Sequence, residues 1–174
     1  MSKDELNKYF EWFIKIIPHR IDELANAVRR STPLGSWEPD LAPASLESLG
    51  SWFGAQIEQR PRTDEEVEQI KSRSAYAFDV SGQELTNQTL SLAMDVGMYL
   101  SQVLLESHPA LRWMLPLDNK KFADYGQPVL IGFGAVPLNP VRIAVMLAYG
   151  IARGTQTGSR LRELHDYWSS RACP

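Results

Sequence analysis

The most apolar stretch of the chain runs from Glu84 to Glu106 and predicts a buried helix. Between Leu90 and Leu105, apolar side chains occupy almost every angle of a helical wheel. A helix that is apolar nearly all round has other elements packed on most of its sides. We expect the polar residues that remain to form one narrow, solvent-facing stripe at helical spacing, made of Glu84, Gln88, Ser91, Asp95, Tyr99, Gln102 and Glu106. We therefore expect this helix to lie at the centre of the fold.

The N-terminal segment predicts a long amphipathic helix. Ser2 and Glu5 form a capping box, in which each side chain accepts a hydrogen bond from the other residue's backbone N–H. Apolar residues then recur at helical spacing from Leu6 to Val28 and pass through Pro18 without losing register. Proline removes one helical hydrogen bond. A kinked helix and two helices joined at Pro18 therefore both fit the pattern.

Two shorter helices are predicted before the central one. Residues 31–43 contain three prolines and one glycine and predict a loop. The stretch from Pro43 to Ile57 has an apolar helical face, and proline suits the first turn of a helix. Thr63 and Glu66 form a second capping box, which opens a short acidic helix.

The last third of the chain predicts two strands followed by two helices. Residues 111–115 and 128–133 are short apolar runs bounded by proline or glycine, as strands are, and would form a hairpin. The loop between them, 116–127, is longer than most hairpin loops and is therefore a place to look for function. Asn139 and the proline after it begin a mostly buried helix, and a last helix begins at Ser159.

These elements predict a mostly helical α+β fold, with a central buried helix, a small antiparallel β-hairpin and flanking helices. The chain has 174 residues, which is enough for one domain, and we expect 1–174 to form it. Hydrophobic residues make up 44% and charged residues 22% of the chain, a composition typical of globular proteins and unlike that of disordered ones.

The distribution of charge favours a basic partner over a nucleic acid. Residues 1–110 contain 10 Lys and Arg against 17 Asp and Glu, a net charge of −7, whereas residues 111–174 contain 8 against 4, a net of +4. The basic surplus is small and scattered, so we predict no nucleic-acid partner. The acidic part suits a protein with a basic surface, although acidic surfaces also serve solubility alone. The candidate partner-binding residues are the cluster at the start of the short helix, Asp64, Glu65, Glu66 and Glu68, which a solvated first helical turn also explains.

Asp95 is the most interesting single carboxylate because it lies half-way along the central helix. If the polar stripe is covered, this carboxylate must be paired or hydrogen-bonded. A buried carboxylate can be catalytic, but a structural hydrogen-bond hub is the more frequent case. A pocket in this region would be lined by Asp95, Tyr99, Trp113, Tyr125 and Gln127. Aromatic core packing at the strand ends explains Trp113 and Tyr125 as well.

The sequence contains no signature of nucleophilic catalysis or of a nucleotide-binding loop, and we predict no catalytic residue, no cofactor and no metal. The three histidines lie far apart and have no second ligand at metal spacing. We expect His19 and His165 at the surface and His108 at a helix end. The turn 154–158 precedes a helix, close to three arginines, and could hold an anion, but an ordinary turn between helices explains it better.

The sequence gives no indication of a membrane partner or of secretion. No apolar run approaches the roughly 20 residues of a membrane span. The first residues, MSKDELNK, lack the basic start and apolar core of a signal peptide. The single cysteine, Cys173, can form no disulfide within the chain. We expect a cytoplasmic protein, and the oligomeric state stays open.

Four parts of the chain together resemble a group of small bacterial proteins that carry domain-of-unknown-function labels. They are YFEWF with RIDEL, LAPASLESLGSWF, DVGMYLSQVLLE with LRW, and YGQPVLIGFG. The resemblance spans residues 4–153. Some members of that class are immunity proteins, which neutralise polymorphic toxins. The shared motifs are packing motifs, so the resemblance implies a fold and a kind of partner but transfers no catalytic residue.

The expected function is that of a non-enzymatic bacterial interaction protein, with the toxin-neutralising role of an immunity protein as the case that the resemblance implies. The alternative is a small-molecule-binding or hydrolytic protein with a pocket near Asp95, Tyr99, Trp113 and Tyr125. A structural subunit of a larger assembly is the third reading.

Overall fold

A computed structural model describes residues 1–31, 37–73 and 80–173. Over these ranges the chain is mostly helical with two small antiparallel sheets, which confirms the predicted α+β class. The elements in chain order are α1 (Lys3–Ser31), α2 (Ser45–Ala55), β1 (Gln59–Pro61), α3 (Asp64–Arg73), β2 (Gln83–Leu85), α4 (Asn87–Ser107), β3 (Arg112–Met114), β4 (Val129–Ile131), α5 (Pro140–Ala152) and α6 (Arg160–Ser169).

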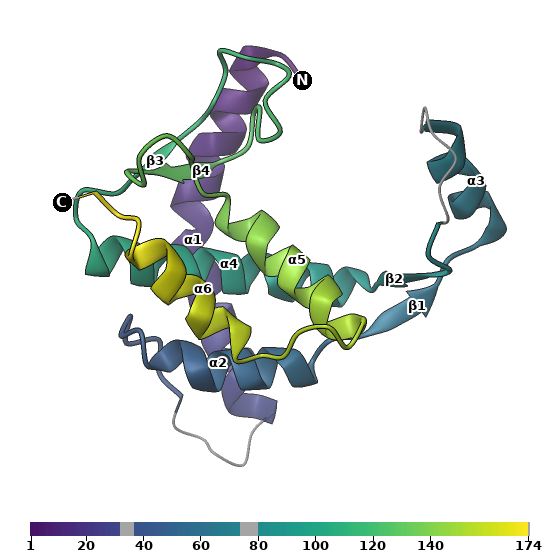
Figure 1. Ribbon diagram of the computed structural model, residues 1–174, viewed down its shortest axis with the longest axis horizontal. Coiled ribbons are helices and arrows are strands. Elements are labelled where there is room, and N and C mark those ends of the chain that lie inside the picture. The colour runs from purple at the N-terminus through teal and green to yellow at the C-terminus, as the bar shows by residue number, and fades with distance from the viewer. Residues whose placement is uncertain (32–36, 74–79, 174) are drawn as a thin grey trace.

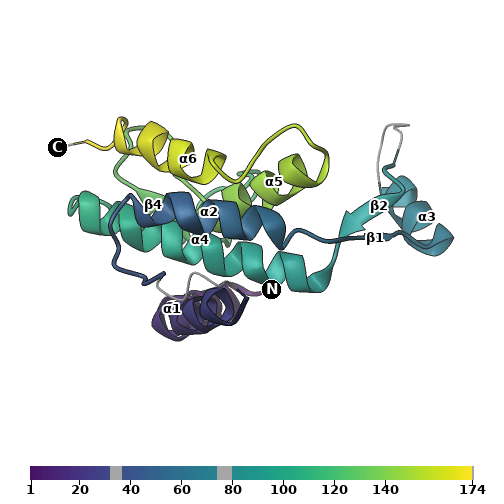
Figure 2. The same ribbon diagram turned by 90° about the horizontal axis from the view of Figure 1, so that it is seen from below.

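The predicted central helix is α4, which lies between two outer layers. Figure 2 shows α1 on one side of α4, and α5 and α6 on the other. Figure 1 shows α1 crossing α4 steeply. Along α4 the side chains of Met98, Leu100 and Leu104 are completely buried, as the apolar helical wheel predicts.

The start of α4 differs from the prediction. The helix begins at Asn87, because the hydroxyl of Thr86 accepts a hydrogen bond from the Thr89 N–H and caps it. Glu84 and Leu85, which the prediction assigned to the helix, belong to β2 (Gln83–Leu85) instead.

Helices α4 and α5 approach each other closely where α5 begins. A β-carbon at Gly97 would lie 2.7 Å from the carbonyl oxygen of Pro140 and from the Cα of Val141. Both of these atoms belong to the backbone, so they cannot swing aside. Glycine at this position therefore sets the spacing between the two helices.

The first helix is continuous. Ser2 Oγ accepts from the Glu5 N–H, and the Glu5 carboxylate accepts from the Ser2 N–H, so the predicted capping box is confirmed. The helix passes through Pro18, which lies on its exposed side, where water can bond the carbonyl that proline leaves free. This segment is therefore one helix and not two helices joined at Pro18.

The predicted hairpin is present, and its strands are shorter than expected. β3 and β4 pair antiparallel, with Trp113 opposite Leu130. In Figure 1 the loop between these strands runs beside the N-terminal half of α1.

A second hairpin, absent from the prediction, builds a projecting arm. We call residues 58–73 and 80–86 the arm; it contains β1, α3 and β2. The two strands pair antiparallel, with Gln59 opposite Leu85 and Pro61 opposite Gln83. Figures 1 and 2 both show the arm extending away from the packed helices. Each strand has three residues, and α3 separates them in the sequence, so no short-range hairpin pattern was present.

Candidate functional site

The arm carries all four residues of the predicted partner-binding cluster. Helix α3 begins at Asp64 and has no buried residue. Asp64, Glu65 and Glu68 are exposed, whereas Glu66 is half-buried. The Lys71 ammonium lies 3.3 Å from the Glu68 carboxylate and balances part of its charge.

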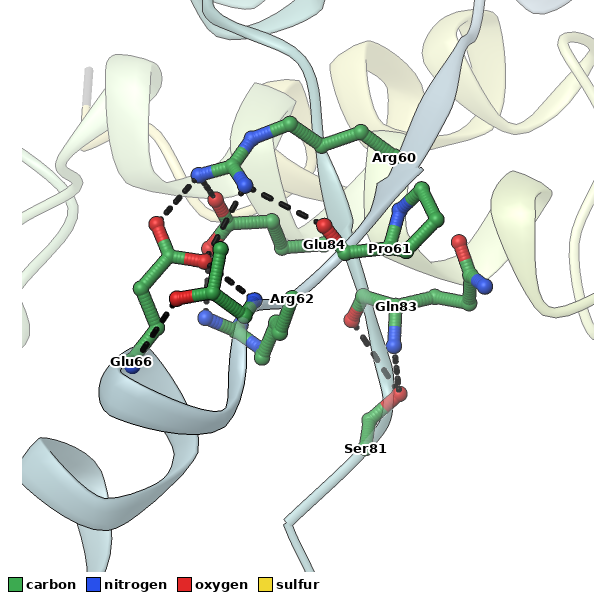
Figure 3. A network of polar contacts seen from close by, with 8 residues as sticks. Arg60, Pro61, Arg62, Glu66, Ser81, Gln83 and Glu84 are labelled. Carbon is green, nitrogen blue, oxygen red and sulfur yellow. Dashed lines mark hydrogen bonds and ion pairs between the residues drawn. The ribbon is translucent and has the colours of Figure 1, made fainter.

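Arg60 of β1 and Arg62, which directly follows that strand, join the three elements of the arm (Figure 3). The Arg60 guanidinium donates two hydrogen bonds to the Glu66 carboxylate, of 2.6 Å and 3.0 Å. Arg60 and Arg62 both pair with Glu84 on β2. Residues two apart on a strand point to the same face, which lets both arginines reach one carboxylate. We call Arg60, Arg62, Glu66 and Glu84 the arm cluster.

Glu66 belongs to the structure of the arm. Its carboxylate accepts from the Thr63 N–H at 2.9 Å, and the Thr63 hydroxyl accepts from the Glu66 N–H, so the second predicted capping box is confirmed. The hydrogen bonds from Arg60, followed by that from Thr63, lower the pKa of Glu66 to about 2. The other three acids of the predicted cluster are left facing solvent. The arm cluster was missed because Arg62 and Glu84 lie 22 positions apart, and no local pattern connects them.

The arm is fastened to the first turn of α4. The Thr89 hydroxyl accepts from the Glu58 N–H at 3.0 Å and donates to the Glu58 carbonyl at 3.2 Å. The Thr86 N–H donates to the same carbonyl at 3.1 Å. The chain therefore enters and leaves the arm at one point.

Asp95 is a structural hub and not part of a wet stripe. Its side chain is 4% exposed. Arg20 of α1 donates two hydrogen bonds to it, from Nε at 2.7 Å and from Nη2 at 2.6 Å, and Nη2 also reaches the Ser91 hydroxyl at 3.2 Å. Burial raises the pKa of Asp95, and the bonds from Arg20 offset part of that rise. The expectation that a covered Asp95 must be paired is confirmed; the solvated stripe was wrong at this position because α1 covers it.

Tyr99 is also covered and fully bonded. Its hydroxyl accepts from the Leu41 N–H at 3.2 Å and shares a hydrogen bond of 2.7 Å with the Ser45 hydroxyl. Trp37 packs edge-on against the Tyr99 ring, with 5.3 Å between ring centroids. Burial raises the pKa of Tyr99. The solvated-stripe prediction fails here too, because residues 37–45 cover the ring.

A cavity of about 380 Å³ lies beside this region, between α1, α5 and the loop 116–127. Of the five residues predicted to line one pocket, Tyr125 and Gln127 line this cavity; Asp95, Tyr99 and Trp113 do not. The full lining is Tyr9, Phe13, Met94, Ala123, Tyr125, Gln127, Pro128, Asn139, Val141, Arg142 and Val145. The five residues predicted to form one pocket therefore lie in two places: three are packed among the helices and strands, and two line the cavity.

Gly126 brings the loop onto α1. Its backbone has φ +71°, and a β-carbon there would lie 2.8 Å from a methyl group of Leu6. This close approach places its neighbours Tyr125 and Gln127 at the cavity. The contributions of Tyr9 and Arg142 were missed, because no local pattern connects α1 with the start of α5.

Two of the three histidines and the turn 154–158 take part in helix ends and helix packing. His108 caps the end of α4, as predicted, and His19 is exposed. His165 is 4% exposed, which contradicts the surface prediction: it lies one helical turn beyond Leu161 on the buried face of α6. Gly158 lies against the backbone of Gly50 in α2.

Among the described residues, no three His, Cys, Asp or Glu side chains are placed to hold a metal ion. None of the helices in the same ranges combines the length and apolarity needed to cross a membrane.

Comparisons with protein-family models, with curated proteins and with solved structures give no match to this chain.

Proposed function

We propose that this protein is a non-enzymatic binding protein that recognises a partner with a basic surface through its arm. The observation that supports this most is the position of α3, which extends away from the packed helices and buries none of its residues. An element that adds little to the core of its own chain is suited to contact another molecule.

The charge of α3 supports a basic partner. Asp64, Glu65 and Glu68 are exposed near its start, and Arg60 and Arg62 are paired with Glu66 and Glu84. Charges of one sign at an interface increase the rate of encounter with an oppositely charged surface. The arm cluster holds the hairpin in one shape before binding, which lowers the entropic cost of association.

The resemblance to immunity proteins suggests a bacterial toxin as the partner. Neutralising a toxin requires only that its working surface be covered, so no catalytic group is needed in this chain. A toxin that acts on nucleic acid would itself carry a basic surface.

Charge reversal on α3 tests the proposal. The partner is first captured from the native host with the wild-type chain, and its association rate is then measured at low and high salt. We expect Glu65→Lys with Glu68→Lys to slow association by about tenfold or more at low salt, and less at high salt. The matched control is Glu106→Lys with Asp118→Lys, which makes the same change in net charge at two exposed positions outside the arm.

The proposal fails if the α3 variant associates at the wild-type rate in low salt, or if both double variants slow association equally. Equal slowing would mean that net charge alone controls encounter. Circular dichroism of each variant checks that the helical content is retained.

A further inference from the structure

We propose that the cavity between α1, α5 and the loop 116–127 binds a small organic carboxylate with an aromatic or branched apolar body. This inference does not depend on the function of the arm, because none of the residues that line the cavity belongs to the arm.

The inner wall of the cavity is apolar. Phe13 is 1% exposed, and Met94, Val141 and Val145 are half-buried around it. The volume of about 380 Å³ lies within the range of roughly 300–1,000 Å³ that is typical of small-molecule sites. Methionine adapts its shape to an apolar ligand and makes favourable contacts with aromatic rings. The wall therefore suits an apolar group about the size of an aromatic ring.

A single positive charge faces this space. Among the described residues that line the cavity, Arg142 is the one with a charged side chain. Its Nη2 donates to the Ala123 carbonyl at 2.6 Å and lies 3.0 Å from the Asp124 carboxylate. The other guanidinium nitrogens, Nη1 and Nε, have no partner in the described parts of the chain, and the side chain is 43% exposed. Free N–H groups of an arginine match a carboxylate in both geometry and charge.

The guanidinium is held in place before any ligand arrives. Asp124 is 7% exposed and accepts a hydrogen bond of 2.8 Å from Asn139, the residue that caps α5. Its carboxylate therefore fixes both Asn139 and Arg142. Because Asp124 is not among the lining residues, the ligand meets the cation and not the acid. This arrangement disfavours amines and other cations.

Two neutral polar side chains at the end of the loop, those of Tyr125 and Gln127, also line the cavity. Neither the Tyr125 hydroxyl nor the Gln127 amide has a hydrogen-bond partner within the ranges that the structure describes. Both can donate to or accept from a polar group of the ligand. A carboxylate held by Arg142 can thus gain a second hydrogen bond from the loop.

Three probes of nearly equal shape test the ligand class. They are 3-phenylpropanoate, its neutral amide 3-phenylpropanamide and the cation phenethylamine, each titrated into the full chain and followed by NMR. We expect the carboxylate to bind at least about tenfold more tightly than the amide, the scale of a hydrogen bond to a charged group. We expect the amine to bind most weakly of the three.

Four variants locate the site. Arg142→Gln should weaken carboxylate binding by about tenfold, to the level of the amide, and leave amide binding unchanged. Arg153→Gln removes an exposed cation outside the cavity and should change nothing. Asp124→Asn keeps Arg142 and removes its counter-charge, so carboxylate binding should be retained or become tighter. Val145→Trp fills the cavity from a half-buried position and should abolish binding of every probe.

Several results would overturn the proposal. Equal affinity for the carboxylate and the amide would show that the cavity does not select a negatively charged ligand. A loss of carboxylate binding in Asp124→Asn as large as that in Arg142→Gln would mean that Arg142 acts only through the fold of the loop. Wild-type binding by Val145→Trp would place the ligand elsewhere. Absence of any shift at the lining residues with all three probes would rule out the site.

Discussion

At the scale of single residues, the pair formed by Arg20 and Asp95 controls how α1 sits on α4. Asp95 is almost completely buried, whereas the Arg20 side chain is 30% exposed. Removing one member of a buried ion pair leaves an uncompensated charge, which costs more than the pair itself contributes. The exposed side of Arg20 reduces this cost, because water can reach the site.

We expect Arg20→Met to lower the free energy of unfolding by about 2–4 kcal/mol at neutral pH, less than for a fully buried pair. Burial already raises the pKa of Asp95, and loss of Arg20 raises it further. An acid whose pKa is higher in the folded state destabilises the fold as pH rises through that range, so the variant should lose less stability in acid. Urea melts at pH 7 and pH 4.5 measure this difference.

The double variant Arg20→Met with Asp95→Asn is the control for that pair. It removes both charges, so it should be more stable at pH 7 than Arg20→Met alone. If the single and double variants are equally stable, the loss of stability comes from the lost packing of the arginine stem and not from the unpaired charge of Asp95.

At the scale of elements, Gly97 decides how closely α4 and α5 approach. Alanine favours a helix over glycine by about 1 kcal/mol, so Gly97→Ala would stabilise an isolated helix. In the folded chain its β-carbon would meet the backbone of Pro140 and Val141 at 2.7 Å. We expect the steric term to dominate and the variant to lose about 1–3 kcal/mol of stability, measured by urea denaturation.

Gly82 offers a matched control for this substitution. Among the residues that the structure describes, no atom would lie within 4 Å of a β-carbon there, and the φ of Gly82 is not in the left-handed region. Gly82→Ala should therefore be neutral or slightly stabilising, because it restricts the unfolded chain. If Gly97→Ala were equally well tolerated, α5 would have room to move away from α4.

The arm should respond to acid through Glu66. The pKa of this carboxyl is about 2 in the folded chain, against an ordinary value of 4.5. A pKa that folding lowers contributes stability that is complete above the ordinary value and is lost as pH falls through about 2. We expect a carbon-13 NMR titration of the Glu66 carboxyl to show a midpoint near pH 2, and a midpoint near 4.5 would contradict the arm cluster.

At the scale of the whole molecule, the sequence predicted the body far better than the arm. The apolar wheel of α4, both capping boxes and the N-cap at Asn139 depend on neighbours a few residues apart, and all were predicted correctly. Contacts between distant segments leave no such pattern. Arg20 and Asp95 lie 75 positions apart. The sequence around Asp95 therefore fits a buried, paired carboxylate as well as a carboxylate that faces solvent.

The candidate sites show the same division. The sequence placed the acidic cluster on a helix start, but it could not show that Glu66 is held by Arg60 or that α3 projects from the body. It selected Tyr125 and Gln127 because the loop is long. It gave no reason to join them to Tyr9 and Arg142, because only the packing of three separate elements forms the cavity.

The shared entry and exit point of the arm has a consequence for how such a chain can diverge. Since Glu58 and Thr86 are hydrogen-bonded to each other, the segment between them is a closed excursion from the body. Insertions, deletions or exchange of this segment leave the distance between its two ends unchanged, so they need not shift the register of α2 or α4. The arm can thus change in length or sequence while the packing between the helices of the body stays the same.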